Sequence, residues 1–159
     1  MTNQINLILS LGSNKGNRYQ QLQLAKKSLQ KVFGNIITSN IYESSAVDYL
    51  NQPDFLNQVI EIKVDSSTWK PIKVLNEILK IESFLGRTRT INKGPRNIDI
   101  DLLFYGVSKI QQPKLIVPHP RLFERSFIVT PLMELPYYAT LSKHFDFSKK
   151  FKNKCHLFN

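Results

Sequence analysis

The alternation of apolar and polar positions in the first half of the chain predicts a strand, a helix and two more strands. Residues 5–11 are mostly apolar and rich in strand-favouring side chains, which predicts a buried first strand. Residues 18–33 repeat apolar side chains at three- and four-residue spacing, the period of a helix, and Asn17 is a candidate N-cap. Residues 36–42 and 55–64 predict the second and third strands.

The next stretch predicts a second helix and a fourth strand. An apolar stripe follows Pro71, a residue type favoured in the first turn of a helix. We expect Ser67 or Thr68 to cap this helix and Gly86 to end it. From Ile98 onwards, β-branched and apolar residues alternate with acidic ones, which predicts a strand.

The order of these elements is β-α-β followed by β-α-β, which is typical of the ferredoxin-like, split βαβ arrangement. We therefore expect an α+β fold, an antiparallel sheet with helices packed on one face, plus a C-terminal extension. The extension holds an extended segment at 114–117 and an apolar, helical segment at 126–135, whereas residues 137–159 fit no pattern. The length corresponds to a single domain, residues 1–159, of which 143–159 form a basic tail.

Two aspartates in the fourth strand give the first indication of chemistry. Asp99 and Asp101 are two residues apart, so they share one face of the strand, about 7 Å apart at Cα. Like charges so close favour a bound cation, and Mg²⁺ takes oxygen ligands that it shares with substrate phosphates. The loop before them is rich in cations: Arg87, Arg89, Lys93 and Arg96. An Asp-x-Asp pair alone also fits a half-solvated strand, but together with these cations it indicates phosphoryl transfer.

Composition limits the alternatives without selecting a partner. The chain has 159 residues, 42% of them hydrophobic, and a formal net charge of +10. Such charge suits nucleic acid or small anions equally. No apolar run approaches a membrane span and no export signal is visible, so we expect a cytoplasmic protein with no membrane partner. The single cysteine, Cys155, allows no internal disulfide.

Several common catalytic motifs are absent from the sequence. The loop from Gly12 to Asn17 lacks the G-x-x-x-x-G-K-[ST] phosphate-binding pattern. The three histidines and one cysteine form no cluster with zinc-ligand spacing, and no G-x-S-x-G or Cys/His arrangement indicates a covalent nucleophile. A reaction that needs a nucleophile from the protein is therefore not expected.

The segment from Gly94 to Leu103 closely resembles the signature of the 6-hydroxymethyl-7,8-dihydropterin pyrophosphokinase family of the folate pathway. Further segments resemble other motifs of this family in the same order: Leu11–Asn14, Gln52–Asn57, Ile81–Glu82, Gly86–Arg89, Val117–Pro120 and Arg125–Phe127. The resemblance implies an ATP-dependent diphosphotransferase that uses ATP as co-substrate and two Mg²⁺ ions, and releases AMP.

The resemblance also implies roles around ATP. Asp99 and Asp101 would hold the two Mg²⁺ ions. Arg87 and Arg96 would clamp phosphate oxygens as the catalytic cations. Further contacts to ATP would come from Leu75, Leu79, Glu82, Arg89, Leu102, Lys114, His119 and Arg125. From the pattern alone, Glu82 at the end of an apolar stripe is instead typical of a solvated rim residue.

On the pterin side, the resemblance implies that Phe55 and Phe127 sandwich the ring and that Asn57 binds its polar edge. The segment from Ser44 to Val47 would add backbone contacts. The chain departs from the family pattern at several positions, which bear on affinity and loop motion rather than on the metal ligands or the phosphate arginines. These are Ser44–Ala46, Phe55, Lys93 and Pro120.

Two other interpretations compete with the enzyme. A basic, ferredoxin-like RNA-binding module would need exposed sheet aromatics in a recognisable pattern. No such pattern is found, and Asp99 and Asp101 would repel a phosphate backbone. A non-catalytic interaction protein leaves the arginines before these aspartates unexplained. We therefore expect a monomeric pyrophosphokinase that binds small molecules and no nucleic acid.

Overall fold

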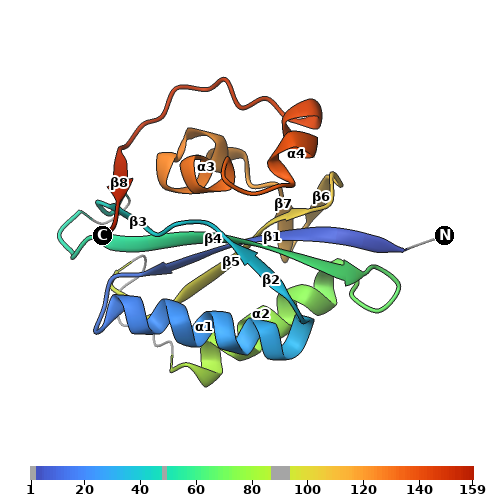
Figure 1. Cartoon of the computed structure of the whole chain (residues 1–159), viewed down its shortest axis with the longest axis horizontal. Coiled ribbons are helices and arrows are strands. Elements are labelled where there is room, and N and C mark those ends of the chain that lie inside the picture. Colours follow the sequence, from blue (N-terminus) through green and yellow to red (C-terminus); the bar gives the residue numbers. More distant parts are fainter. Residues whose placement is uncertain (1–2, 48–49, 87–93) are drawn as a thin grey trace.

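The computed structural model describes residues 3–47, 50–86 and 94–159, and within them the chain forms a mixed α/β fold around an antiparallel sheet (Figure 1). The sheet has the strand order β5-β1-β4-β3-β8, and β2 also pairs with β4. Its strands are β1 (Gln4–Ser13), β2 (Ile36–Thr38), β3 (Tyr42–Ser44), β4 (Phe55–Asp65), β5 (Asp99–Tyr105) and β8 (Cys155–Leu157). A separate hairpin joins β6 (Ile110–Gln112) to β7 (Leu115–Val117).

Both faces of the sheet are covered by helices (Figure 1). The helices are α1 (Arg18–Phe33), α2 (Pro71–Phe84), α3 (Ser126–Leu132) and α4 (Tyr138–His144), with a 3-10 helix at Pro120–Glu124. Alternation along β1 separates two cores: Leu7 packs with residues of α1 and α2, and Ile8 packs with residues of α3 and α4. Helices α1 and α2 lie on one face, as expected, but α3 and α4 cover the other face, which the expectation did not include.

The two long helices begin and end largely where the pattern predicts. Asn17 caps α1, accepting a hydrogen bond from the Gln20 backbone N–H at 3.0 Å. The cap of α2 is different from the expected one, because Lys70 occupies that position and makes no side-chain cap bond. Ser67 instead donates its hydroxyl to Asp65 Oδ1 in the turn before the helix.

The predicted second strand, residues 36–42, is wrong in one respect: the structure divides it into β2 and β3. Both pair with β4, but Ser39 between them turns its side chain into the sheet. Its hydroxyl accepts from the Val59 backbone N–H, and its carbonyl accepts from the Gln58 side chain at 2.6 Å. These bonds interrupt the ladder, so that β3 starts again closer to the end of β4.

The C-terminal segment adds to the fold rather than forming a free tail. Residues 143–159 include the end of α4 and β8, which pairs with β3 at the edge of the sheet. Phe145 and Phe147 pack against the buried ring of Phe104. No helix in the described part of the chain is long and apolar enough to cross a membrane.

Candidate active site

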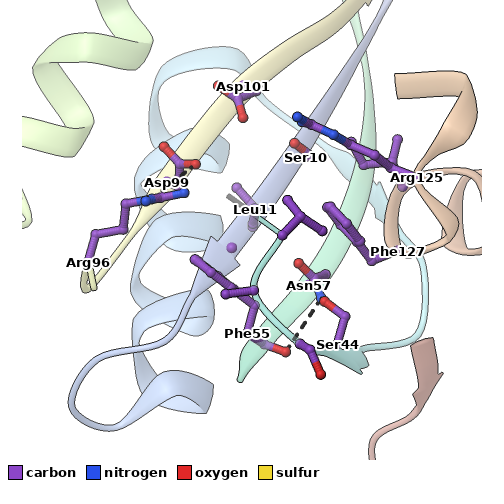
Figure 2. A pocket seen from close by; sticks show the side chains of 15 residues that line it. Ser10, Leu11, Ser44, Phe55, Asn57, Arg96, Asp99, Asp101, Arg125 and Phe127 are labelled. Atoms are coloured by element: carbon purple, nitrogen blue, oxygen red, sulfur yellow. Dashed lines mark hydrogen bonds and ion pairs between the residues drawn. The ribbon is translucent and has the colours of Figure 1, made fainter. Parts of the chain in front are cut away.

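The two aspartates lie on β5 and share one face of that strand, as its alternation predicts. Asp99 is half-buried and Asp101 is exposed, while Ile100 between them is buried on the other face. Their register partners on β1 are Gly12 and Ser10, which are both small. Space therefore remains beside each carboxylate, and both aspartates face a common cavity (Figure 2).

Arg96 holds a cation beside the first aspartate. Its Nε lies 3.4 Å from Asp99 Oδ2, and its Nη1 donates to the Gly94 carbonyl at 2.8 Å. The same guanidinium lies over the Phe55 ring, 5.0 Å from the centroid. Arg96 therefore connects the acidic strand with an aromatic wall of the cavity (Figure 2).

A buried asparagine that the sequence reasoning assigned no role fixes the backbone of Arg96. Asn14 Oδ1 accepts from the Arg96 N–H at 2.9 Å, and the Asn14 N–H donates to the Arg96 carbonyl at 3.1 Å. Its Nδ2 donates to Gln52 Oε1 at 2.8 Å and to the Pro53 carbonyl at 3.0 Å. Asn14 thereby ties the segment of the phosphate arginine to the segment that leads into β4. The sequence feature that could have indicated this role is the place of Asn14 in the Leu11–Asn14 motif.

The five residues expected to bind the pterin line one cavity together with Arg96, Asp99 and Asp101: Ser44, Val47, Phe55, Asn57 and Phe127. Figure 2 shows Phe55 and Phe127 on either side of Asn57. Asn57 Nδ2 donates to Ser44 Oγ at 2.9 Å and to the Tyr42 carbonyl at 3.2 Å. These bonds orient the amide, so that its oxygen is the atom left to meet a ligand. Ser10, Leu11 and Gly12 also line this cavity, which the sequence reasoning did not foresee.

A second cavity, of about 390 Å³, lies beside the first. Except for Arg96, which lines the first cavity, the described residues expected to contact ATP line the second: Leu75, Leu79, Glu82, Leu102, Lys114, His119 and Arg125. Leucine side chains with a few polar groups are typical of pockets for flat heterocycles. Asp101, Arg125 and Ile128 line both cavities, so the two spaces meet at these side chains.

Glu82 is a buried anchor and not the solvated rim residue that its place on the helix suggests. Only 4% of it is exposed, and its Oε2 accepts from the Ile100 backbone N–H at 2.7 Å. Ile100 lies between the two aspartates on β5, the edge strand that pairs with β1. The carboxylate of α2 thus fixes the acidic strand, and it also lines the second cavity.

Two arginines lie close enough to His119, a residue of the second cavity, to affect its charge state. Burial lowers the pKa of His119 first, and the charges of Arg125 and Arg121 lower it further. Its Nδ1 accepts from the Arg121 backbone N–H at 3.1 Å, which leaves Nε2 as the protonated nitrogen of the neutral ring. His119 is therefore an uncharged hydrogen-bond donor at neutral pH.

Part of the predicted phosphate loop lies outside the residues that the structure describes. Arg87, Arg89 and Lys93 lie outside the described residues, so their predicted roles stay predictions. Among the described residues, no group of three or more His, Cys, Asp or Glu side chains forms a metal cluster. Asp99 and Asp101 form a pair, which is the donor number expected of a site that shares its cation with a substrate.

Paired carboxylates beside guanidinium groups are typical of enzymes that transfer phosphoryl groups. The adjoining cavities, one with aromatic walls and one lined by leucines, are typical of pockets for small heterocycles. Comparison with known proteins gives the particular family. The sequence model of 7,8-dihydro-6-hydroxymethylpterin-pyrophosphokinase (HPPK) matches residues 8–137. The chain belongs to this family.

Individual relatives agree with this assignment. The 2-amino-4-hydroxy-6-hydroxymethyldihydropteridine pyrophosphokinase of Bacillus subtilis is 40% identical over 129 residues, 80% of this chain and 75% of that protein. The protein of the same name in Haemophilus influenzae is 35% identical, over 82% of this chain and 81% of its own length. The chain spans much less of longer relatives, such as 17% of the folic acid synthesis protein fol1 of Pneumocystis carinii at 41% identity.

Solved structures show the same fold at lower sequence identity. A crystal structure of HPPK-DHPS in complex with substrates superposes with a TM-score of 0.67 at 14% identity, over 93% of this chain and 42% of that one. A triple mutant of Plasmodium falciparum HPPK-DHPS gives 0.62 at 17% identity, over 82% and 40%. The family predicted from the sequence, an ATP-dependent pyrophosphokinase family of folate biosynthesis, is confirmed by the family match and the bacterial relatives.

Proposed function

We propose that this chain transfers diphosphate from ATP to the hydroxymethyl oxygen of 6-hydroxymethyl-7,8-dihydropterin and releases AMP. One observation carries the proposal. Except for Arg96, which lines the pterin cavity, the described residues expected to contact ATP line one cavity. Those expected to contact the pterin line another, and both cavities include Asp101 and Arg125. Because the two substrates must meet at their reacting atoms, the shared side chains mark where the ATP phosphates would reach the pterin hydroxymethyl group.

The reaction needs alignment and charge neutralisation rather than a nucleophile from the protein. The hydroxymethyl oxygen attacks the β-phosphorus of ATP, the bond to the oxygen that bridges the α- and β-phosphates breaks, and AMP leaves with that oxygen. Arg125, which lines both cavities, and Arg96, which lies beside Asp99 in the first, are cations suited to stabilise phosphate oxygens as charge shifts towards AMP. We assign Arg87, on sequence grounds, to the same task.

The donor set fits two magnesium ions. Asp99 and Asp101 offer hard carboxylate oxygens on one strand face, and their neighbours Ser10 and Gly12 leave room for hydrated ions. These two aspartates would hold the ions. When bound, Mg²⁺ would neutralise the charge of the ATP phosphates and so ease attack by an oxygen nucleophile.

The aromatic cavity suits a flat, polar heterocycle. Phe55 and Phe127 offer apolar ring faces, and stacking on such faces is favourable for a heteroaromatic ring. Asn57 would bind the polar edge of the pterin through its oxygen, because its nitrogen is engaged with Ser44. Backbone groups from Ser44 to Val47 would add the remaining polar contacts.

The architecture supports two finer points of the proposal. The strand path β5-β1-β4-β2, all antiparallel, agrees with the ferredoxin-like connectivity, to which β3 and β8 add an edge. Neither cavity needs a residue from a second copy to form its walls, which supports a monomer as the working unit. We also propose a cytoplasmic location, where ATP is abundant and the lone Cys155 would stay reduced.

The decisive test is release of AMP from Mg-ATP with and without 6-hydroxymethyl-7,8-dihydropterin, with EDTA as the control. AMP that depends on the pterin and disappears with EDTA is the expected result. ADP in place of AMP, or AMP that forms without the pterin, would contradict the proposal.

A further inference from the structure

The last part of the chain, beyond the region that matches the family, contacts two elements that carry residues of the pterin cavity. The family match ends at residue 137. Beyond α4 the chain runs along the outside of α3 and ends in β8 beside β3 (Figure 1). Residues 152–157, which we call the C-terminal brace, contact both the start of α3 and the edge of the sheet.

The first contact of the brace caps α3. Arg125 is the N-cap residue of this helix and makes no side-chain cap bond. Asn153 takes this role from outside: its Oδ1 accepts from the Ser126 backbone N–H at 2.9 Å and from the Ser126 hydroxyl at 2.8 Å. Ser126 is 4% exposed, so without Asn153 two buried donors would lose their acceptor.

The capped turn carries Phe127, a wall of the pterin cavity. Arg125, on the other side of Ser126, is held by bonds of its own: its N–H donates to Leu122, and its carbonyl accepts from Ile128 and Val129. The Asn153 bonds therefore bear on the placement of Phe127 more than on that of Arg125.

The second contact of the brace is with the strand that orients Asn57. Within β8, Cys155 is the register partner of Ser44, whose hydroxyl accepts from the Asn57 side chain. Directly before the first contact, the Lys152 backbone N–H donates to the Glu124 carbonyl at 3.0 Å. A single short segment thus joins the strand that orients Asn57 to the helix that carries Phe127.

We propose that Asn153 is a positioning residue for the pterin substrate, acting through Phe127, and that the C-terminal brace sets the spacing between Phe127 and the strand that orients Asn57. The inference rests on the proposed function, because it takes Phe127 as a contact of the pterin ring. It assigns a specific task to a segment outside the family match, beyond simple closure of the fold.

The test compares Asn153→Ala with Asn153→Asp, which keeps an acceptor at the same place. Lys150→Ala, at an exposed position two residues before the brace, is the matched control. Loss of a helix cap lowers the equilibrium constant for forming the capped turn by about fivefold. We expect Asn153→Ala to raise the KM for the pterin about fivefold while the KM for ATP changes less than twofold, and Asn153→Asp to restore the wild-type value.

A double-mutant cycle with Phe127→Ala tests whether Asn153 acts on the pterin through the Phe127 ring. If Asn153 acts through this ring, Asn153→Ala adds nothing to the pterin KM once the ring is removed. A further fivefold rise in the pterin KM in the Phe127→Ala background would show that Asn153 does not act through this ring. Unchanged pterin KM in Asn153→Ala, or equal losses for both substrates with a lower melting temperature, would overturn the inference. Wild-type protein that releases no AMP with the pterin would instead refute the proposed function, and this inference with it.

Discussion

Replacing Asn14 by alanine tests how the site is held together, because this side chain joins three segments of the chain. It is 2% exposed and takes part in three hydrogen bonds, with Gln52, Pro53 and the Arg96 backbone N–H. Alanine removes all three and leaves the Arg96 N–H without its acceptor. The backbone bond from the N–H of residue 14 to the Arg96 carbonyl would remain, but residue 14 would no longer be tied by its side chain to the loop before β4.

The expected loss of stability follows from these bonds. Each hydrogen bond contributes about 0.5–1.5 kcal/mol net, so the three together predict a loss of about 3 kcal/mol. For a domain of this size, each kcal/mol lowers the melting temperature by about 2–4 °C, which predicts a fall of about 6–12 °C. The kinetic effect comes from misplacement of Arg96, and a shift of about 1 Å can cost up to a hundredfold in rate. We therefore expect kcat to fall by about tenfold to a hundredfold.

Urea unfolding would measure the stability change and AMP release the rate. Asn17→Ala is the matched control, because Asn17 lies in the same loop but only caps α1 through Gln20. Loss of that cap should cost about 1 kcal/mol with no change in kcat. A loss below about 1 kcal/mol for Asn14→Ala, together with wild-type kcat, would refute the reasoning.

Three further predictions concern the acidic side chains. Asp101→Ala should lower kcat by about 10²–10³ with little change in melting temperature, and a near-normal rate would show that this carboxylate holds no catalytic cation. Glu82→Ala should cost about 1–3 kcal/mol in urea unfolding, because it leaves the Ile100 N–H unsatisfied, whereas Glu82→Gln should recover most of the loss. The Arg18 hydrogen bond lowers the pKa of Glu43, so its stabilisation is present above pH 4.5 and is lost as the pH falls through the lowered value. Arg18→Gln should therefore flatten the pH dependence of unfolding below pH 5, and an unchanged dependence would contradict this.

The elements predicted well from the sequence are those whose signals are local. The helix at 18–33 has a regular apolar stripe and its own cap, and α1 begins and ends at these residues. Alternation around Asp99 and Asp101 correctly gave their common face. Side-chain period and capping chemistry depend on neighbours in sequence, so no knowledge of the fold is needed to use them.

The features that the sequence did not reveal depend on distant partners. The break between β2 and β3 results from bonds of Ser39 to β4, twenty residues away. β8 has three residues and no strong alternation, and it exists because β3 offers an unpaired edge. The helix pattern predicts a surface position for Glu82, whereas in the fold its carboxylate is buried and accepts from a backbone N–H of β5. Asn14 is similar, since its partners lie 38 and 82 residues away.

The same architecture bears on the RNA-binding interpretation that the net charge of +10 invites. RNA-binding modules with a ferredoxin-like fold stack bases on an open face of the sheet, using exposed aromatic rings. Here helices α1 and α2 cover one face, and α3 and α4 cover the other (Figure 1). Phe104, on β5, points into the second core and contacts Phe123 and Phe145, so this ring is unavailable for stacking. Phe55 and Phe127 instead line a cavity beside Arg96 and Arg125, the cavity proposed above for a single heterocycle rather than a strand of bases.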